Sequence, residues 1–134
     1  MMYDQDMSKK WKVIYYEENN KAEVYDFIES LMEKSQGKIL AWISLLEDKG
    51  PTLPRPYADL LGNGIHELRI KLTGDQIRIL YFFCYEDYIV LTNYFVKTTD
   101  KVPTNEINKA LKCKESFLKK YTIKNIEEQY NENI

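Results

Sequence analysis

The sequence is poor in the residues that build metal centres and covalent cross-links. It has one histidine, His66, and only two cysteines, Cys84 and Cys113, which stand far apart. Their spacing matches no zinc motif and favours two reduced, partly buried thiols. No glycine-rich phosphate loop is present, and no Ser/His/Asp set can be assembled around a single histidine. We therefore expect a chain that uses neither a metal nor another cofactor.

Long apolar runs are also absent. No segment approaches the ~20 apolar residues of a membrane span, and residues 1–12 lack the apolar core of a secretory signal. We expect a cytoplasmic protein without a membrane partner. Its 134 residues, 44% hydrophobic and 30% charged, predict one globular domain over 1–134, with a core at about 11–121 and a polar tail at 122–134.

Excess charge of one sign is missing overall, but the charges are unevenly distributed. The net charge is −2. Residues 1–62 carry 8 basic and 11 acidic side chains, residues 63–121 carry 10 and 7, and residues 122–134 carry 1 and 3. The chain thus has an acidic front, a basic rear and an acidic tail. This asymmetry is compatible with a local anionic ligand.

The first half predicts one strand followed by two helices. The run at 11–17 is rich in β-branched and aromatic residues, whereas apolar residues recur at helical spacing over 21–34 and 37–49. The triplet SQG at 35–37 is interpreted as the break in an antiparallel helical hairpin. Residues 49–57 contain three of the four prolines, which predicts a connector.

Strand-like runs dominate the second half. Three of them, at 65–72, 76–85 and 88–97, are separated by short turn sequences, which favours an antiparallel meander. A helical stripe follows Pro103, and the segment 122–134 is interpreted as a frayed tail. The predicted order is β-α-α-β-β-β-α. This is an α+β domain with a small, mostly antiparallel sheet, an N-terminal helical hairpin and a C-terminal helix, with the helices on one face.

Strand alternation separates two kinds of side chain in the run at 65–72. Glu67, Arg69 and Lys71 fall on one face, and His66 falls among the apolar residues of the other. His66 is interpreted as a core residue on this parity. Arg78 interrupts an apolar row of the next strand, and two readings stay open for it: an ion pair with Glu67 across the hairpin, or a phosphate ligand.

A second group of polar residues lies where the third strand ends. Lys97, Thr98, Thr99 and Lys101 surround the turn into the last helix, whose N-terminal amides favour anions. Solvated surface is the alternative for each of them. The combination still makes this turn a candidate anion-binding segment.

Several of these strings together resemble the RelE superfamily of toxins, and specifically its phage-derived HigB-like branch. The resemblance covers about 13–120. It rests on Gly64–Arg69, Arg78–Tyr81, Phe95–Thr99 and Pro103–Ile107, which match the family's Glu-Leu-Arg strand, its arginine-bearing strand, its Phe-x-Lys strand end and its Pro-x-x-Glu-Ile helix start.

The resemblance implies the toxin of a type II toxin–antitoxin pair. Such a toxin is a ribosome-dependent endoribonuclease that cleaves messenger RNA without a metal and so inhibits translation. The catalytic candidates that it implies are Arg78 as a phosphate clamp, with Arg69 and Lys71 for charge stabilisation and proton handling. Lys97, Thr98, Lys101 and His66 become candidate RNA contacts, and the resemblance raises His66 to a candidate acid–base group.

The implied partners are the ribosome with its messenger RNA and a helix-turn-helix antitoxin, with promoter DNA bound only through the toxin–antitoxin complex. Two positions depart from the family pattern. Thr98 replaces the second basic residue of the strand end, and Thr104 occupies the region of a terminal tyrosine or histidine. The alternative is therefore a non-catalytic RelE-fold protein that binds an antitoxin or a phage partner. A third hypothesis is a nucleic-acid-binding module without chemistry.

Overall fold

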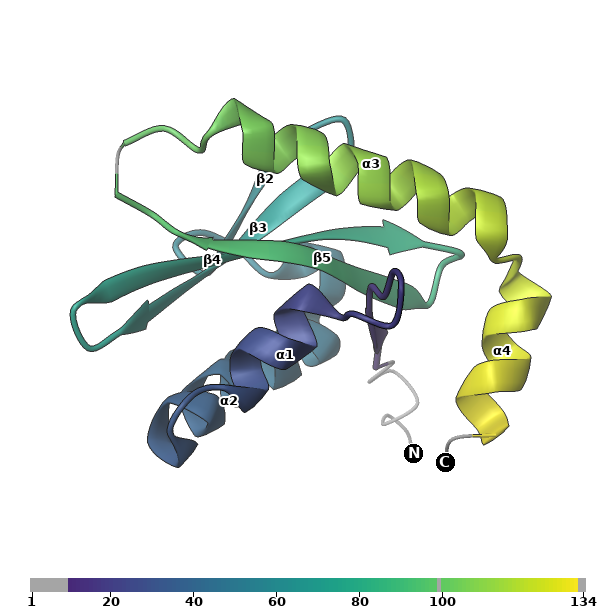
Figure 1. Ribbon diagram of the computed structural model, residues 1–134, viewed down its shortest axis with the longest axis horizontal. Coiled ribbons are helices and arrows are strands. Elements are labelled where there is room, and N and C mark those ends of the chain that lie inside the picture. Colours follow the sequence, from purple (N-terminus) through teal and green to yellow (C-terminus); the bar gives the residue numbers. More distant parts are fainter. Residues whose placement is uncertain (1–9, 99, 133–134) are drawn as a thin grey trace, which may run out of the picture.

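The computed structural model describes residues 10–98 and 100–132 as a mixed α+β fold around one five-stranded sheet (Figure 1). The strands are β1 (Lys12–Tyr15), β2 (Ala58–Gly62), β3 (Ile65–Leu72), β4 (Asp75–Cys84) and β5 (Tyr88–Val96). They lie in the order β1-β5-β4-β3-β2. Strand β1 is parallel to β5 and every other pair is antiparallel, so the predicted meander and the mostly antiparallel sheet are confirmed.

The helical hairpin is present, but its break lies earlier than expected. Helix α1 spans Glu23–Glu29 and α2 spans Glu33–Lys49. The SQG triplet therefore belongs to the start of α2, and its interpretation as the break was wrong. The side-chain amide of Gln36 donates a 2.8 Å hydrogen bond to the carbonyl of Ile28 and so caps the end of α1. Gln36, which was assigned to the break between the helices, lies within α2 and caps α1.

Helices cover both faces of the sheet, which corrects the expectation of helices on one face. Figure 1 shows α1 and α2 against one face and α3 (Thr104–Lys120) across the other. Each face has its own apolar cluster. The cluster under α2 includes Leu68, Ile70 and Ile79, and the cluster under α3 includes Leu80, Phe82 and Phe117. Alternation along β3 and β4 supplies both clusters from the same strands.

Two elements were missed by the sequence interpretation. The five residues of β2 pair with β3 directly after the proline-rich connector, which holds a short 3₁₀ turn at Gly50–Thr52. The segment expected to be a frayed tail contains helix α4 (Ile123–Glu132), in which Ile126 is buried against the α3 side of the sheet. In the described ranges, no helix has both the length and the apolar character needed to cross a bilayer.

Candidate functional site

The hairpin of β3 and β4 carries the cationic residues that the sequence singled out. Arg69 lies directly opposite Arg78 in the strand register, and Lys71 lies opposite Gln76. All four share the face on which Leu80 and Phe82 pack under α3, so the predicted strand parity is confirmed. The first turn of α3 contacts the sheet at Asn93, whose side-chain amide donates to Glu106 over 3.0 Å. In Figure 1 the hairpin continues beyond this end of α3.

Arg78 is buried and makes an ion pair with an even more deeply buried carboxylate. Its Nε lies 3.2 Å from Oε1 of Glu67, and the exposed fractions of the two side chains are 8% and 1%. Neither of these two atoms has a hydrogen-bond partner, so the N–H does not point at the oxygen. Burial lowers the pKa of Arg78, and the charge of Glu67 opposes that shift. Of the two readings left open for Arg78, the structure contains the ion pair.

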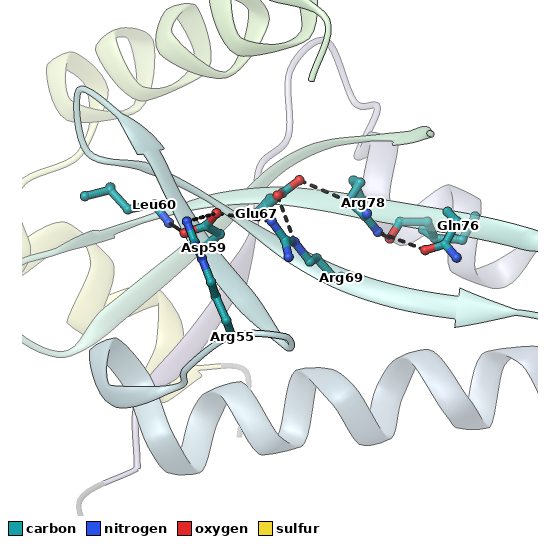
Figure 2. A network of polar contacts seen from close by, with 8 residues as sticks. Arg55, Asp59, Leu60, Glu67, Arg69, Gln76 and Arg78 are labelled. Atoms are coloured by element: carbon teal, nitrogen blue, oxygen red, sulfur yellow. Dashed lines mark hydrogen bonds and ion pairs between the residues drawn. The ribbon is translucent and has the colours of Figure 1, made fainter. Parts of the chain in front are cut away.

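Two carboxylates bind Arg69, and both contacts are shorter than the contact between Arg78 and Glu67. Its Nε donates to Oε2 of Glu67 over 3.0 Å and its Nη2 to Oδ2 of Asp59 over 3.1 Å. Asp59, on β2, also accepts from Arg55 over 3.0 Å, and this hydrogen bond is the main cause of its lowered pKa. Figure 2 shows the resulting chain of contacts, which runs from Arg55 through Asp59 and Glu67 to Arg78 and Gln76.

The arginine pair, Arg69 and Arg78, retains donors that no described residue uses. The contacts of Arg78 are all long: 3.2 Å to Glu67, 3.4 Å to Gln76 and 3.5 Å to the Ile77 carbonyl. They occupy Nε and Nη1, so within the described chain Nη2 has no partner. A guanidinium has five N–H donors and binds phosphate through two of them side by side.

Charge around the arginine pair is not balanced. Two carboxylates, Asp59 and Glu67, face four cations, which are Arg55, Arg69, Arg78 and the exposed Lys71. The cluster of Glu67, Arg69, Lys71 and Arg78 thus has a formal net charge of +2. A buried guanidinium with an open nitrogen and a surplus of positive charge is suited to an anionic ligand.

The second group of candidates lies next to this cluster. The backbone N–H of Lys97 donates to the Gln76 carbonyl over 2.8 Å, which places the end of β5 beside the start of β4. Lys97 is half-buried, and both Thr98 and Lys101 are exposed. Thr99 lies outside the described residues. Lys97 therefore lies beside the arginine pair at one end of the sheet.

His66 lies on the opposite face of β3, as its parity predicted. Its ring stacks on Tyr81 at a centroid distance of 5.2 Å and meets Phe83 edge-on at 5.0 Å. Burial, followed by the nearby charge of Lys114, lowers the pKa of His66. The sheet therefore separates this histidine from Arg69 and Arg78. Over the described ranges, no group of metal-ligating side chains gathers in one place.

The residues that sequence reasoning missed come from outside the meander. Asp59 lies on the unrecognised strand β2, and Trp42 and Tyr57 flank the arginine pair from α2 and from the proline-rich connector. Gln76 was noted only as a member of a strand row. Asp59, which follows the prolines and Arg55, was the one available indication of this ion-pair network, because a carboxylate close to an arginine suggests an ion pair.

A comparison with protein families identifies the family of the chain. Residues 26–115 match the family described as phage derived protein Gp49-like (DUF891), and the match spans the end of α1, all of α2, the whole β2–β5 meander and most of α3. The chain belongs to this phage-derived Gp49-like family, which is a toxin-like family related to RelE. No curated protein is similar enough to the chain to count as a match.

Proposed function

We propose that this chain is the toxin of a type II toxin–antitoxin pair of the HigB-like kind, acting as a ribosome-dependent endoribonuclease on messenger RNA. The observation that carries the proposal is the arginine pair, in which the buried Arg78 keeps a nitrogen without a partner among the described residues and Arg69 is half-buried. Membership of a toxin-like family supports it.

The reaction would be a transesterification within the RNA backbone. The ribose 2′-oxygen attacks the adjacent phosphorus and loses its proton, and the bond from phosphorus to the 5′-oxygen breaks as that oxygen gains a proton. The products are a 2′,3′-cyclic phosphate and a free 5′-hydroxyl. Negative charge grows on the two non-bridging oxygens of the phosphorane, where donors held in place stabilise it most.

The cationic residues have different roles in this proposal. Arg78 is the phosphate clamp, and Arg69 is a second source of positive charge that Glu67 and Asp59 hold in place. Lys71 is solvent-exposed in the free chain, so it would handle protons only after bound RNA had displaced its water. Glu67 acts as a positioning residue, because its carboxylate contacts both arginines.

A helix-turn-helix antitoxin is the partner we propose for this toxin. Its binding would have to neutralise or cover the cationic end of the sheet, and promoter DNA would be bound only by the joint complex. Complementary charge would speed the association of an acidic antitoxin segment with the +2 cluster.

One observation favours a second candidate function. Glu67 and Asp59 already bind the donors that would otherwise contact a phosphate, so the site is partly self-neutralised in the free chain. Thr98 adds no charge at the strand end. Both features suit a non-catalytic protein that kept the fold and the antitoxin contact but lost the nuclease.

The test is to induce the wild type and an Arg78→Lys variant in bacteria and to map messenger RNA ends by primer extension. Lysine keeps a cation opposite Glu67, which protects the fold, but it lacks the planar fork that binds a phosphate. We expect wild-type cuts that depend on translation, and at least about a 100-fold loss of cleavage in the variant. Arg55→Lys is the matched control, since Arg55 is exposed and its ion pair among the described residues is with Asp59.

The outcomes separate the two candidate functions. If the Arg78→Lys variant makes the same cuts as the wild type, Arg78 has no part in the cleavage reaction. Soluble wild-type protein that produces no cuts and permits normal growth would support the non-catalytic protein.

A further inference from the structure

An open cavity of about 330 Å³ adjoins the arginine pair. Two unlike groups of side chains line it. One group is polar and consists of Arg69, Lys71, Gln76 and Arg78; the other, here called the aromatic wall, consists of Trp42 and Tyr57. The volume lies at the lower end of the range typical of ligand pockets, about 300–1,000 Å³. Cations and exposed aromatic rings therefore meet in one small space.

Tyr57 stands in this wall on a backbone that is held at both of its polar groups. Its N–H donates to the Pro54 carbonyl over 3.0 Å, and its carbonyl accepts the N–H of Arg69 over 2.8 Å. The second bond ties Tyr57 directly to the strand that carries the arginine. The ring itself is 38% exposed, so a fixed main chain presents a ring surface to solvent.

Trp42 supports this ring from α2. The two ring centroids are 6.0 Å apart with planes tilted by 58°, and the Trp42 ring is half-buried. The ammonium group of Lys38 lies 5.8 Å from the Trp42 centroid. Trp42 is therefore packed between its own helix and Tyr57, which restricts the positions that the Tyr57 ring can take.

The combination of side chains narrows the class of ligand. An inorganic anion would use the cations and gain nothing from the aromatic wall, whereas an apolar peptide would use the wall and gain nothing from the surplus positive charge. A nucleotide unit uses both groups, because it has a flat base and a phosphate only a few bonds apart. Bases stack on exposed tyrosine rings while neighbouring cations follow the phosphates.

We propose that the aromatic wall binds a nucleobase of the RNA by stacking on Tyr57, beside the phosphate held by the arginine pair. This inference deepens the proposed function, and it rests on that function only for the identity of the strand as RNA. Tyr57 is the contact residue, and Trp42 is a positioning residue. Stacking accepts any base, and it is stronger for the larger ring system of a purine.

The experiment compares two short oligonucleotides that cannot be cleaved. One is a 2′-O-methyl pentanucleotide with a central adenine, and the other has the same backbone with an abasic central residue, so only the base differs. Binding of fluorescein-labelled oligonucleotide to the full chain is followed by anisotropy. The proteins are the wild type, Tyr57→Ala, Tyr57→Phe and Lys71→Met.

We expect the adenine oligonucleotide to bind the wild type about 5- to 150-fold more tightly than the abasic one, which is the range found for single stacking contacts. Tyr57→Ala should remove this difference, and Tyr57→Phe should keep it because the ring is retained. Lys71→Met should weaken both oligonucleotides equally and reduce the salt dependence, as expected for a phosphate contact.

A matched control is Tyr25→Ala. Tyr25 is 48% exposed on α1 and does not line the cavity, so its loss should leave both affinities unchanged. Melting temperatures check that each variant is folded. Equal wild-type affinity for the two oligonucleotides, an unchanged preference in Tyr57→Ala, or no binding of either up to millimolar protein would each overturn the proposal.

Failure of the nuclease proposal would give a different pattern. The oligonucleotides cannot react, so their binding does not depend on the nuclease. If the protein makes no cuts in cells but still prefers the adenine oligonucleotide through Tyr57, the stacking site is supported and only the nuclease proposal fails. A chain that cuts messenger RNA but shows no base preference loses only the stacking site.

Discussion

The face of the sheet under α3 has two unlike ends, although the same two strands build both. At one end Ile65 and Phe82 are fully buried in the apolar cluster beneath α3. At the other end Glu67, Arg69 and Arg78 occupy the same row of the alternation. Strand periodicity continues unbroken while the chemistry changes from apolar to ionic at the point where the cover of α3 ends (Figure 1).

The two ends differ in what they contribute to folding. Burial of an aromatic or aliphatic side chain stabilises a fold by roughly 1.5–3 kcal/mol. A buried ion pair contributes little net free energy, because removing both charges from water costs about as much as their attraction returns. The Glu67–Arg78 pair is buried without an aligned hydrogen bond, so its net contribution should be small. Ligand binding explains the ionic end better than stability does.

Replacing the ion pair with apolar residues should give the largest effect and test this comparison directly. Arg78→Met alone leaves the buried Glu67 carboxylate with only one of its two arginine partners, Arg69, which we expect to cost up to about 3–5 kcal/mol of unfolding free energy. Adding Glu67→Leu should restore most of that loss, because the ionic end then resembles the apolar end. Urea denaturation of both variants and the wild type measures the difference.

RNA cleavage should be lost in both of these variants, whatever their stability. A double variant as unstable as the single one would show that the pair does contribute to folding, and the contrast between the two ends would fail. The Glu67→Leu single variant completes the cycle and gives the coupling energy of the pair.

Local patterns were sufficient to predict much of this face. Period-two alternation placed Arg69 and Lys71 on one side of β3 and His66 on the other, and turn residues set the ends of β3, β4 and β5 within one or two positions. These features depend on neighbours along the chain. The hairpin register then follows from the short turn at Gly74, whose φ of 81° suits glycine.

Features that depend on distant contacts were not predictable. Strand β2 has five residues and little pattern of its own, and its pairing with β3 creates the Asp59–Arg69 contact. Helix α4 has a polar sequence and is held by tertiary contacts of Ile126. Tyr57 and Trp42 come from different elements, and nothing in their local sequence indicates that they meet beside Arg78.

The opposite face of β3 offers a smaller, pH-dependent test. His66 is packed between Tyr81 and Phe83, and burial keeps its folded-state pKa below the ordinary value of 6.5. The neutral ring is therefore favoured in the folded state. Its contribution to stability is present above pH 6.5 and is lost as the pH falls below that value toward the folded-state pKa.

His66→Phe should remove this pH-dependent loss while keeping the aromatic contacts. We expect the stability difference between variant and wild type to grow in favour of the variant as the pH falls from 6.5 to 5. Thermal melts at half-unit intervals measure it, and His66 is the only histidine in the chain. A constant difference would mean that burial does not disfavour the charged ring. RNA cleavage should not change, because the sheet separates His66 from the arginine pair.

Asp59→Asn should give the smallest effect, since it alters the solvent-exposed edge of the same ionic end. The substitution weakens the contacts to Arg55, which is 74% exposed, and to Arg69, so we expect a loss of about 0.2–1 kcal/mol at neutral pH. Because Arg55 lowers the pKa of Asp59, this contribution should disappear as the pH falls below 3.8.

The contribution of Asp59 should also shrink in 1 M salt, which screens exposed charges. The Glu67–Arg78 coupling should shrink less in the same salt, because the two side chains are only 8% and 1% exposed. An equal salt dependence for both contacts would mean that solvent reaches Glu67 and that the ionic end is surface throughout.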